Sequence, residues 1–521
     1  MPNLAVIASY IPSIREPIQK LTFREKAKWT LIILVLFFVL GSITVYGVNS
    51  DAIARFEFLE IVFGSRFGSI ITLGIGPIVT ASIILQLLVG SKIINWNLSD
   101  PDDKKKFSGT QKILTVAFCF IEGIAYVIAN AVPPATPDIG LMIFVILQLA
   151  FGGIIIMFMD EVVSKWGFGS GVSLFIVAGV AKTILVRTLN PLTQSCGQGG
   201  IYSIATCFPS SGELPSGIIP SLISTLLQGT PNLFSLMPLI GTILVFIIVV
   251  FVQNVEVEIP MAFSLPYGKF ASKRWPLKFL YTSNIPVILV AAVLANIQVL
   301  GRVLYSRGIS FLGTFNSEGS PNPGGLMYYL SAPSSEIGIM VVTIIASIFA
   351  LLFVILALKV LKKNAFKMSL LGALIGIFVG YSLLFFGILP GVITTDSLFH
   401  ALIYISVYVM GSVIFSVFWT ATSGMDAKSV AEQFKSYFIM IPGFRHDPRI
   451  AENVLDRYIP ALTIMGGAFI GFLAAYADLT AAIGTGTGLL LAVTIIYQLY
   501  EQINQQHSED MPPAIKKFLG D

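Results

Sequence analysis

The chain has 521 residues, of which 55% are apolar and only 12% are charged, and its mean hydropathy is +0.84. A soluble domain carries about 25% charged residues, so a water-soluble core could not hide this much apolar surface. The composition therefore excludes a soluble globular protein and indicates an integral membrane protein, whereas the net charge of +4 says little by itself.

Stretches of about 20 apolar residues are long enough to cross a bilayer as helices. A membrane barrel would instead show short strands with alternating side chains, so the pattern predicts an all-helical bundle. The N-terminal stretch has no short apolar core followed by a small-residue cleavage site, and we expect no removable signal peptide. The candidate spans are residues 30–48, 69–90, 112–132, 139–160, 170–188, 237–256, 284–304, 337–358, 368–390, 398–420, 459–477 and 483–500.

The second span begins irregularly. Its sequence, "ITLGIGPIVTASIILQ", starts with Gly74, Gly76 and Pro77, and three later stretches share this character: "GFGSGVSLFI", "TSNIPVILV" and "IGTGTGLLL". Irregular backbone at membrane depth survives only where protein or a water-filled cavity covers it. Close helix packing through small residues explains one such break. Four of them in one chain predict a central cavity.

Most of the 32 Lys and Arg residues lie in alternate connections between the spans. By the positive-inside rule this bias predicts that both termini are cytoplasmic. Two of the cytoplasmic segments, residues 261–284 and 424–458, are long and basic. Topology and affinity for anionic lipid account for basic loops in general, but the length of these two favours a docking surface for a large, negatively charged partner.

The sequence lacks the residues that intramembrane chemistry needs. It has only three histidines and no His/Cys cluster, phosphate-binding loop or nucleophile elbow, so we expect no metal, no cofactor and no enzyme activity. Asp160 and Glu161 are expected to be solvated at a cytoplasmic end, and Asp478 lies at an external end. Glu122 lies inside a span, where a carboxylate is costly, and is either functional or a protonated, hydrogen-bonded packing group.

The three cysteines differ in their surroundings. Cys119 lies in an apolar segment and is expected to be a packing residue. Cys196 and Cys207 flank a short polar loop, and a disulfide between them is permitted if that loop is external, although spacing alone does not establish it.

Several long stretches resemble signatures of the SecY/Sec61-alpha family, the protein-conducting channel of the general secretory pathway. They are, in order, "ITLGIGPIVTASIILQLL", "YTSNIPVIL", "LANIQ", "FWTATSGMD", "PGFR", "RYIPALT" and "GTGTGLLLAV". The resemblance covers roughly residues 10–505 and is strongest to archaeal members. It implies two pseudo-symmetric five-helix halves that form a clamshell around an hourglass pore.

The resemblance also implies roles for particular residues. A lateral gate would have spans two and three on one side and spans seven and eight on the other. It would contain Thr80, Glu122 and Asn296. A plug would correspond to residues 52–68. An apolar ring at the waist of the pore would consist of Ile75, Val79, Val172, Ile176, Ile288 and Leu491.

Partners and localisation follow from the same resemblance. Ribosome docking would use Lys273, Arg274 and Arg445 in the two long basic loops. Small SecE/gamma-like and beta-like membrane subunits would complete a heterotrimer, and signal peptides and nascent chains would pass through a channel in the cell membrane. Force would come from a docked partner, because the chain has no nucleotide-binding motif.

The sequence departs from the family in having twelve candidate spans where the family has ten. The surplus is a helical hairpin at about residues 336–394. We expect an N-terminal half of residues 1–190, an external loop of residues 191–236, and a C-terminal half of residues 237–521 that contains the hairpin. Gly372, Gly376 and Gly380 form a ladder suited to tight helix packing. Because the hairpin lies between spans seven and eight, it could brace or restrict the gate.

Two other classes of protein remain as alternatives. A secondary transporter would also have broken helices and paired repeats, but the apolar ring and the scarcity of buried ion ligands argue against it. An intramembrane enzyme would need catalytic residues that the sequence lacks.

Overall fold

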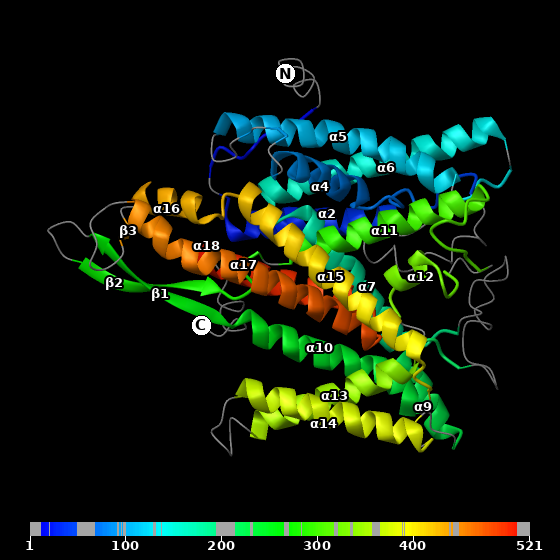
Figure 1. Cartoon of the computed structure of the whole chain (residues 1–521). Helices are drawn as coiled ribbons and strands as arrows, with labels where there is room; N and C mark the ends of the chain where they lie inside the picture. The colour runs from blue at the N-terminus through cyan, green and yellow to red at the C-terminus, as the bar shows by residue number, and fades with distance from the viewer. Residues whose placement is uncertain are drawn as a thin grey trace.

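The computed structural model describes the greater part of the chain. The described residues are 12–19, 21–48, 68–90, 93–94, 96, 101–128, 132–136, 138–193, 214–229, 233–264, 270–282, 284–316, 321–333, 337–356, 365–387, 389, 391–436, 439–440 and 448–507. They form a bundle of long helices with a small sheet projecting beyond one end (Figure 1).

The helices fall into two groups along the chain. The first group is α2 (Phe23–Ser42), α4 (Gly76–Gly90), α5 (Pro101–Ile128), α6 (Ile139–Trp166) and α7 (Gly171–Leu189). The short α9 (Ile218–Leu227) and η2 (Leu233–Leu236) connect it to the second. The second group is α10 (Met237–Gln253), α11 (Ile285–Ser306), α12 (Leu326–Leu330), α13 (Ile337–Leu356), α14 (Ala365–Phe385), α15 (Thr395–Thr422), α16 (Ala427–Ser436), α17 (Pro448–Leu479) and α18 (Gly486–His507).

The predicted helical membrane bundle is confirmed. Among the described residues, nine helices are long and apolar enough to cross a membrane. The other three predicted spans form α2, α4 and α18. Helix α4 has only 15 residues, because it begins after the glycine-rich break. Helix α2 starts with a charged stretch and α18 ends with an amide-rich one, which lowers their hydropathy.

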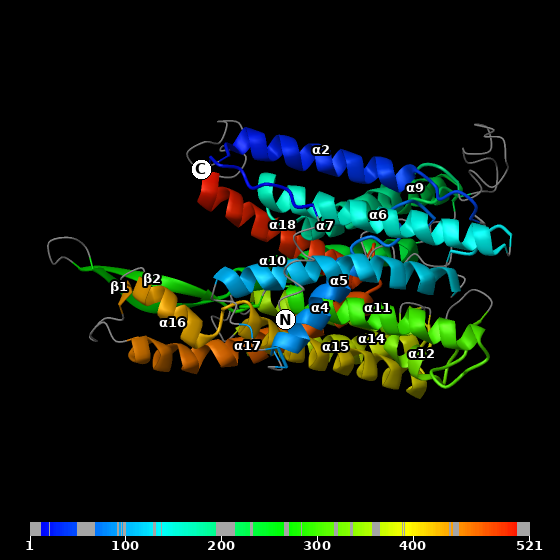
Figure 2. The same ribbon diagram turned by 90° about the horizontal axis from the view of Figure 1, so that it is seen from above.

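The two groups of helices meet along two seams. On one side α7 packs against α18, and on the other α4 and α5 pack against α11 and α15. Figure 2 shows α7 beside α18, and α4 beside α11. Cores from both groups merge into one large apolar cluster, so the bundle is continuous across the seams.

A three-stranded sheet stands outside the helices and was not expected from the sequence. Strands β1 (Glu256–Ser264) and β2 (Phe270–Lys278) form an antiparallel hairpin, and β3 (Ile439–Met440) pairs with β1. The base of the hairpin packs on α16 and α17, where the rings of Trp275 and Phe434 meet edge to face at 4.8 Å. The two long basic segments, distant in the sequence, are therefore joined in one unit.

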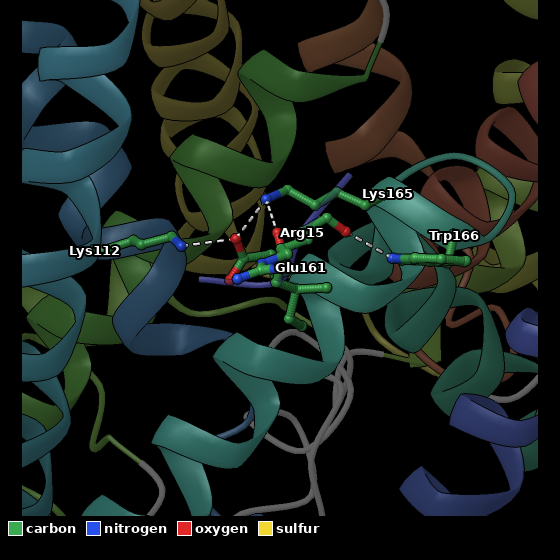
Figure 3. A network of polar contacts seen from close by, with 6 residues as sticks. Arg15, Lys112, Glu161, Lys165 and Trp166 are labelled. Carbon is green, nitrogen blue, oxygen red and sulfur yellow. Dashed lines mark hydrogen bonds and ion pairs between the residues drawn. The ribbon is translucent and has the colours of Figure 1, made fainter. Parts of the chain in front are cut away.

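Polar contacts tie the N-terminal segment to the first group of helices (Figure 3). Glu161 accepts from Lys112 of α5 at 2.7 Å and from Lys165 of α6 at 2.9 Å. Lys165 also donates to the backbone carbonyl of Ile14, and the Trp166 indole N–H donates to that of Arg15 at 3.0 Å. The expectation that Glu161 is solvated is wrong, because its side chain is only 11% exposed and sits between two lysines.

The surplus helices α13 and α14 form the predicted hairpin, and its glycine ladder faces inward. A Cβ on Gly376 would lie 2.6 Å from the Ala346 Cα, and one on Gly372 would lie 2.6 Å from the Phe349 carbonyl oxygen. These clashes mean that the two helices touch through backbone, as the small-residue spacing predicts.

The hairpin packs against the second group of helices. Helix α13 packs on α10 and α17, and Figure 1 shows α13 and α14 along the edge of the bundle opposite α5. Ile339 of α13 also shares a small apolar cluster with Ala401 of α15, so both roles considered for the hairpin, bracing the gate and restricting it, stay predictions.

We expect Gly376→Leu to lower the unfolding free energy by about 1–3 kcal/mol, because overpacking must push α14 away from α13. Thermal unfolding of the purified protein in detergent measures the loss. Phe378→Leu is the matched control, since Phe378 lies on the same helix and is 74% exposed. Equal melting temperatures for the two variants would contradict the tight contact.

Candidate functional site

All four interrupted stretches become helix starts. Helix α4 begins at Gly76, α7 at Gly171, α11 at Ile285 and α18 at Gly486. Before α4, residues 71–75 form turns, and all of residues 71–79 are buried. Helix α6 passes so close to this stretch that a Cβ on Gly152 would lie 1.8 Å from the Ile70 carbonyl oxygen. Protein thus covers the irregular backbone, as the argument from membrane depth predicts.

The six residues of the implied ring belong to one apolar cluster. Ile75, Val79, Ile176 and Leu491 are buried in it, and the half-buried Val172 and Ile288 pack against it. Ile75 lies one residue before α4, and the other five lie within the first six residues of α4, α7, α11 or α18. Membership of a common cluster is what a ring requires, and the ring itself stays a prediction.

The three residues of the implied lateral gate are in direct contact. The Thr80 hydroxyl donates to Glu122 Oε1 at 2.9 Å and accepts from Asn296 Nδ2 at 3.1 Å. Thr80 lies on α4, Glu122 on α5 and Asn296 on α11, so one hydroxyl links both groups of helices across the seam. A threonine hydroxyl can donate one bond and accept two, which suits it to this bridging position.

Glu122 is deeply buried at this contact, with 6% of its surface exposed. Its second oxygen, Oε2, has no hydrogen-bond partner among the described residues. A carboxyl group in this position is costly unless it is bonded or protonated. The contact is therefore a polar weak point in an otherwise apolar seam, and its role as a gate stays a prediction.

Two acidic residues have partners that the sequence did not reveal. Asp160 Oδ1 accepts from the backbone N–H of Val172 at 2.8 Å, and Asp478 Oδ1 accepts from that of Thr487 at 2.9 Å. The expectation that Asp160 is solvated is therefore wrong. Asp478 does lie at a helix end, but it is buried and also accepts from the Tyr404 hydroxyl at 2.7 Å.

Tyr404 and Thr487 are the contact residues that sequence reasoning missed. The available signal was an acidic residue shortly before each Gly-rich break, in the stretches that end at Gly171 and Gly486. A carboxylate there can cap the helix that follows, because the first N–H groups of a helix lack partners of their own.

The implied docking residues lie in or near the sheet. In strand β2, Lys273 is opposite Met261 and Arg274 is opposite Pro260. Arg445 lies outside the described residues, five positions after β3 ends at Met440. The implied plug, residues 52–68, lies outside them except for Gly68.

Cys196 and Cys207 are outside the described residues, whereas Cys119 is buried beside Gly153. In the described part of the chain, no group of three or more His, Cys, Asp or Glu side chains is placed to hold a metal ion.

We expect Thr80→Val to lower the unfolding free energy by about 1–3 kcal/mol, because it leaves the buried Glu122 and the half-buried Asn296 without their shared partner. Thermal unfolding in detergent measures the effect. Thr115→Val is the control, since Thr115 is a threonine at least as buried as Thr80 whose hydroxyl donates to the Gln111 carbonyl in its own helix. If both variants lose the same stability, the contact does not hold the seam.

Comparison with known proteins places this arrangement in a family. The model of the SecY family matches residues 69–500. The protein translocase subunit SecY of Methanocaldococcus jannaschii is 39% identical over 520 residues, which covers 100% of both chains. All of the most similar curated relatives are archaeal proteins of the same name.

Solved structures agree with the sequence comparison. A structure described as that of a protein conducting channel matches with a TM-score of 0.74 and 38% identity, over 98% of this chain and 99% of that one. Sec61 in the canine ribosome-channel complex from the endoplasmic reticulum matches with a TM-score of 0.71 at the same identity and coverage.

Proposed function

Since the chain belongs to the SecY family, we propose that it is the pore-forming subunit of the general secretory protein translocase. Unfolded polypeptides cross the membrane through it, and sufficiently apolar segments leave sideways into lipid. The observation that carries the proposal is the convergence of four interrupted helices on one apolar cluster, next to a polar seam between two groups of helices.

The apolar cluster suits a constriction that must accept any side chain. Aliphatic groups make contacts without directional preference, so they do not select among sequences. They also dewet a narrow passage, which then resists ions when no polypeptide fills it. Ile75 and Ile288, which belong to opposite groups of helices, are two of the proposed ring residues.

The polar seam suits an exit into lipid. A side-chain hydrogen bond joins α4 and α11 between Asn296 and Thr80, and a single neutral bond contributes only about 0.5–1.5 kcal/mol. Opening the seam costs little there, while partition of about 20 apolar residues into lipid is favourable. Thr80, Glu122 and Asn296 thus form a gate that a signal peptide can open.

The sheet suits a docking surface for a ribosome. Pairing of β1 with β3 brings the two basic segments together, and the hairpin projects beyond the helices (Figure 1). Lys273, Arg274 and Arg445 would meet ribosomal phosphates, as Arg and Lys commonly do. In this proposal both termini are cytoplasmic, and small SecE/gamma-like and beta-like subunits complete the complex in the cell membrane. Residues 52–68 act as a plug. The chain is a passive conduit without a catalytic step.

The pore assignment is tested by placing a single cysteine at Ile75 or Ile288 in a chain whose three native cysteines are replaced by serine. We expect either cysteine to crosslink to a cysteine in a stalled secretory polypeptide, because the polypeptide must pass the constriction. Phe151, which is 62% exposed on α6, gives the control position. Crosslinks at residue 151 without any at 75 or 288 would remove the pore assignment.

The docking assignment is tested by charge reversal. We expect Arg445→Glu to weaken ribosome binding about tenfold at low salt, with less difference at high salt, because counterions screen contacts to phosphate. Co-sedimentation of ribosomes with proteoliposomes measures the affinity. Lys367→Glu, at the exposed start of α14, is the control of equal charge change, and an equal loss for both variants would indicate a general charge effect.

A further inference from the structure

The starts of α7 and α18 are built in the same way. Each helix begins at the third residue of a Gly-[Ser/Thr]-Gly-x sequence, Gly169 to Val172 in the first and Gly484 to Thr487 in the second. In both, the first glycine has a positive φ, 68° at Gly169 and 81° at Gly484. The shared sequence therefore produces the same turn in the two halves of the molecule.

The second glycine of each sequence lies directly against the helix that comes before. A Cβ on Gly171 would lie 2.5 Å from the Asp160 Cα, and one on Gly486 would lie 1.8 Å from the carbonyl carbon of Ala477, next to Asp478. Only glycine permits this approach, which brings a carboxylate within reach of the next helix start.

The carboxylate then caps that helix at the same position of the sequence. Asp160 accepts from the N–H of the fourth residue, Val172, and Asp478 from that of the fourth residue, Thr487. One helical turn further on, at i+4 and on the same face, are Ile176 and Leu491.

We propose that Asp160 and Asp478 are paired positioning residues of the pore, which fix the starts of α7 and α18 and thereby hold Ile176 and Leu491 in the constriction. The inference rests on the proposed function of these two apolar residues. Neither aspartate contacts the polypeptide in transit, and each acts through the helix that it caps.

The test measures the position of each helix from the reactivity of one cysteine, at 176 or 491, toward a water-soluble thiol reagent in proteoliposomes. Loss of a helix cap costs enough free energy to change the equilibrium for local opening of the helix start about tenfold. We expect Asp160→Ala to raise the reactivity at 176 about tenfold and leave 491 unchanged, and Asp478→Ala to do the reverse. Asp160→Asn and Asp478→Asn keep an oxygen for the backbone N–H, and we expect them to restore low reactivity.

Asp138→Ala is the matched control, because Asp138 caps α6 through the Leu141 N–H at 3.3 Å and α6 carries no ring residue. A rise at both positions in every alanine variant would mean general loosening and would overturn the inference, as would no rise at either. The thiol-reactivity measurement needs no transported chain, so its outcome is independent of the test of the proposed function. If the cysteines at 75 and 288 fail to crosslink, the pore assignment is overturned, but the measured effect of the caps on helix position stands.

Discussion

The first backbone N–H groups of a helix have no partner inside the helix, and within a bilayer water does not supply one. This constraint falls on every helix that starts inside the bundle. Helix α4 meets it with the turn before it, through the bond from the Gly76 N–H to the Leu73 carbonyl at 3.1 Å, and α11 meets it with the Asn284 carbonyl. Helices α7 and α18 use carboxylates from the preceding helix. Polar contacts rather than apolar packing therefore fix where the helices that carry the proposed pore residues begin.

The turn between α17 and α18 carries the clearest backbone strain. Ala481 and Thr485 have φ values of 47° and 62°, and they are the non-glycine residues with positive φ among those described. Such residues cost about 1–3 kcal/mol each and persist only where their surroundings hold them. The surroundings here include the Thr242 hydroxyl of α10, which accepts from the Ile483 N–H at 2.9 Å. Strain of this kind can persist because α10 and Asp478 both hold the turn.

Local pattern predicted the helices, the breaks and the inserted hairpin, because each leaves a signal within a few residues. The contact of Thr80 with Glu122 and Asn296 came from resemblance to a family, since nothing local pairs residues so far apart in the sequence. The sheet was missed because the expected loops were read for charge and length, and β1 and β3 become neighbours only through the fold. Asp160 was misread because a carboxylate near a helix end normally faces water. The partners of Asp160 and Asp478 were missed because they lie on the next helix, which glycines bring against each carboxylate.

The hairpin α13–α14 touches the same strained turn from outside. The Thr343 hydroxyl lies 3.5 Å from the Leu479 carbonyl oxygen, and the Ser347 hydroxyl forms a hydrogen bond with the Tyr476 hydroxyl. Helix α13 therefore contacts the last turn of α17 on both sides of Asp478. Helix α14 covers α13 and leaves its own outer face, with Phe378 and Phe385, to the surroundings. We propose that the hairpin braces the second group of helices at this position without crossing the seam at Thr80. A channel that opens sideways needs that combination, because its halves must separate as rigid bodies while each keeps its own part of the constriction in place.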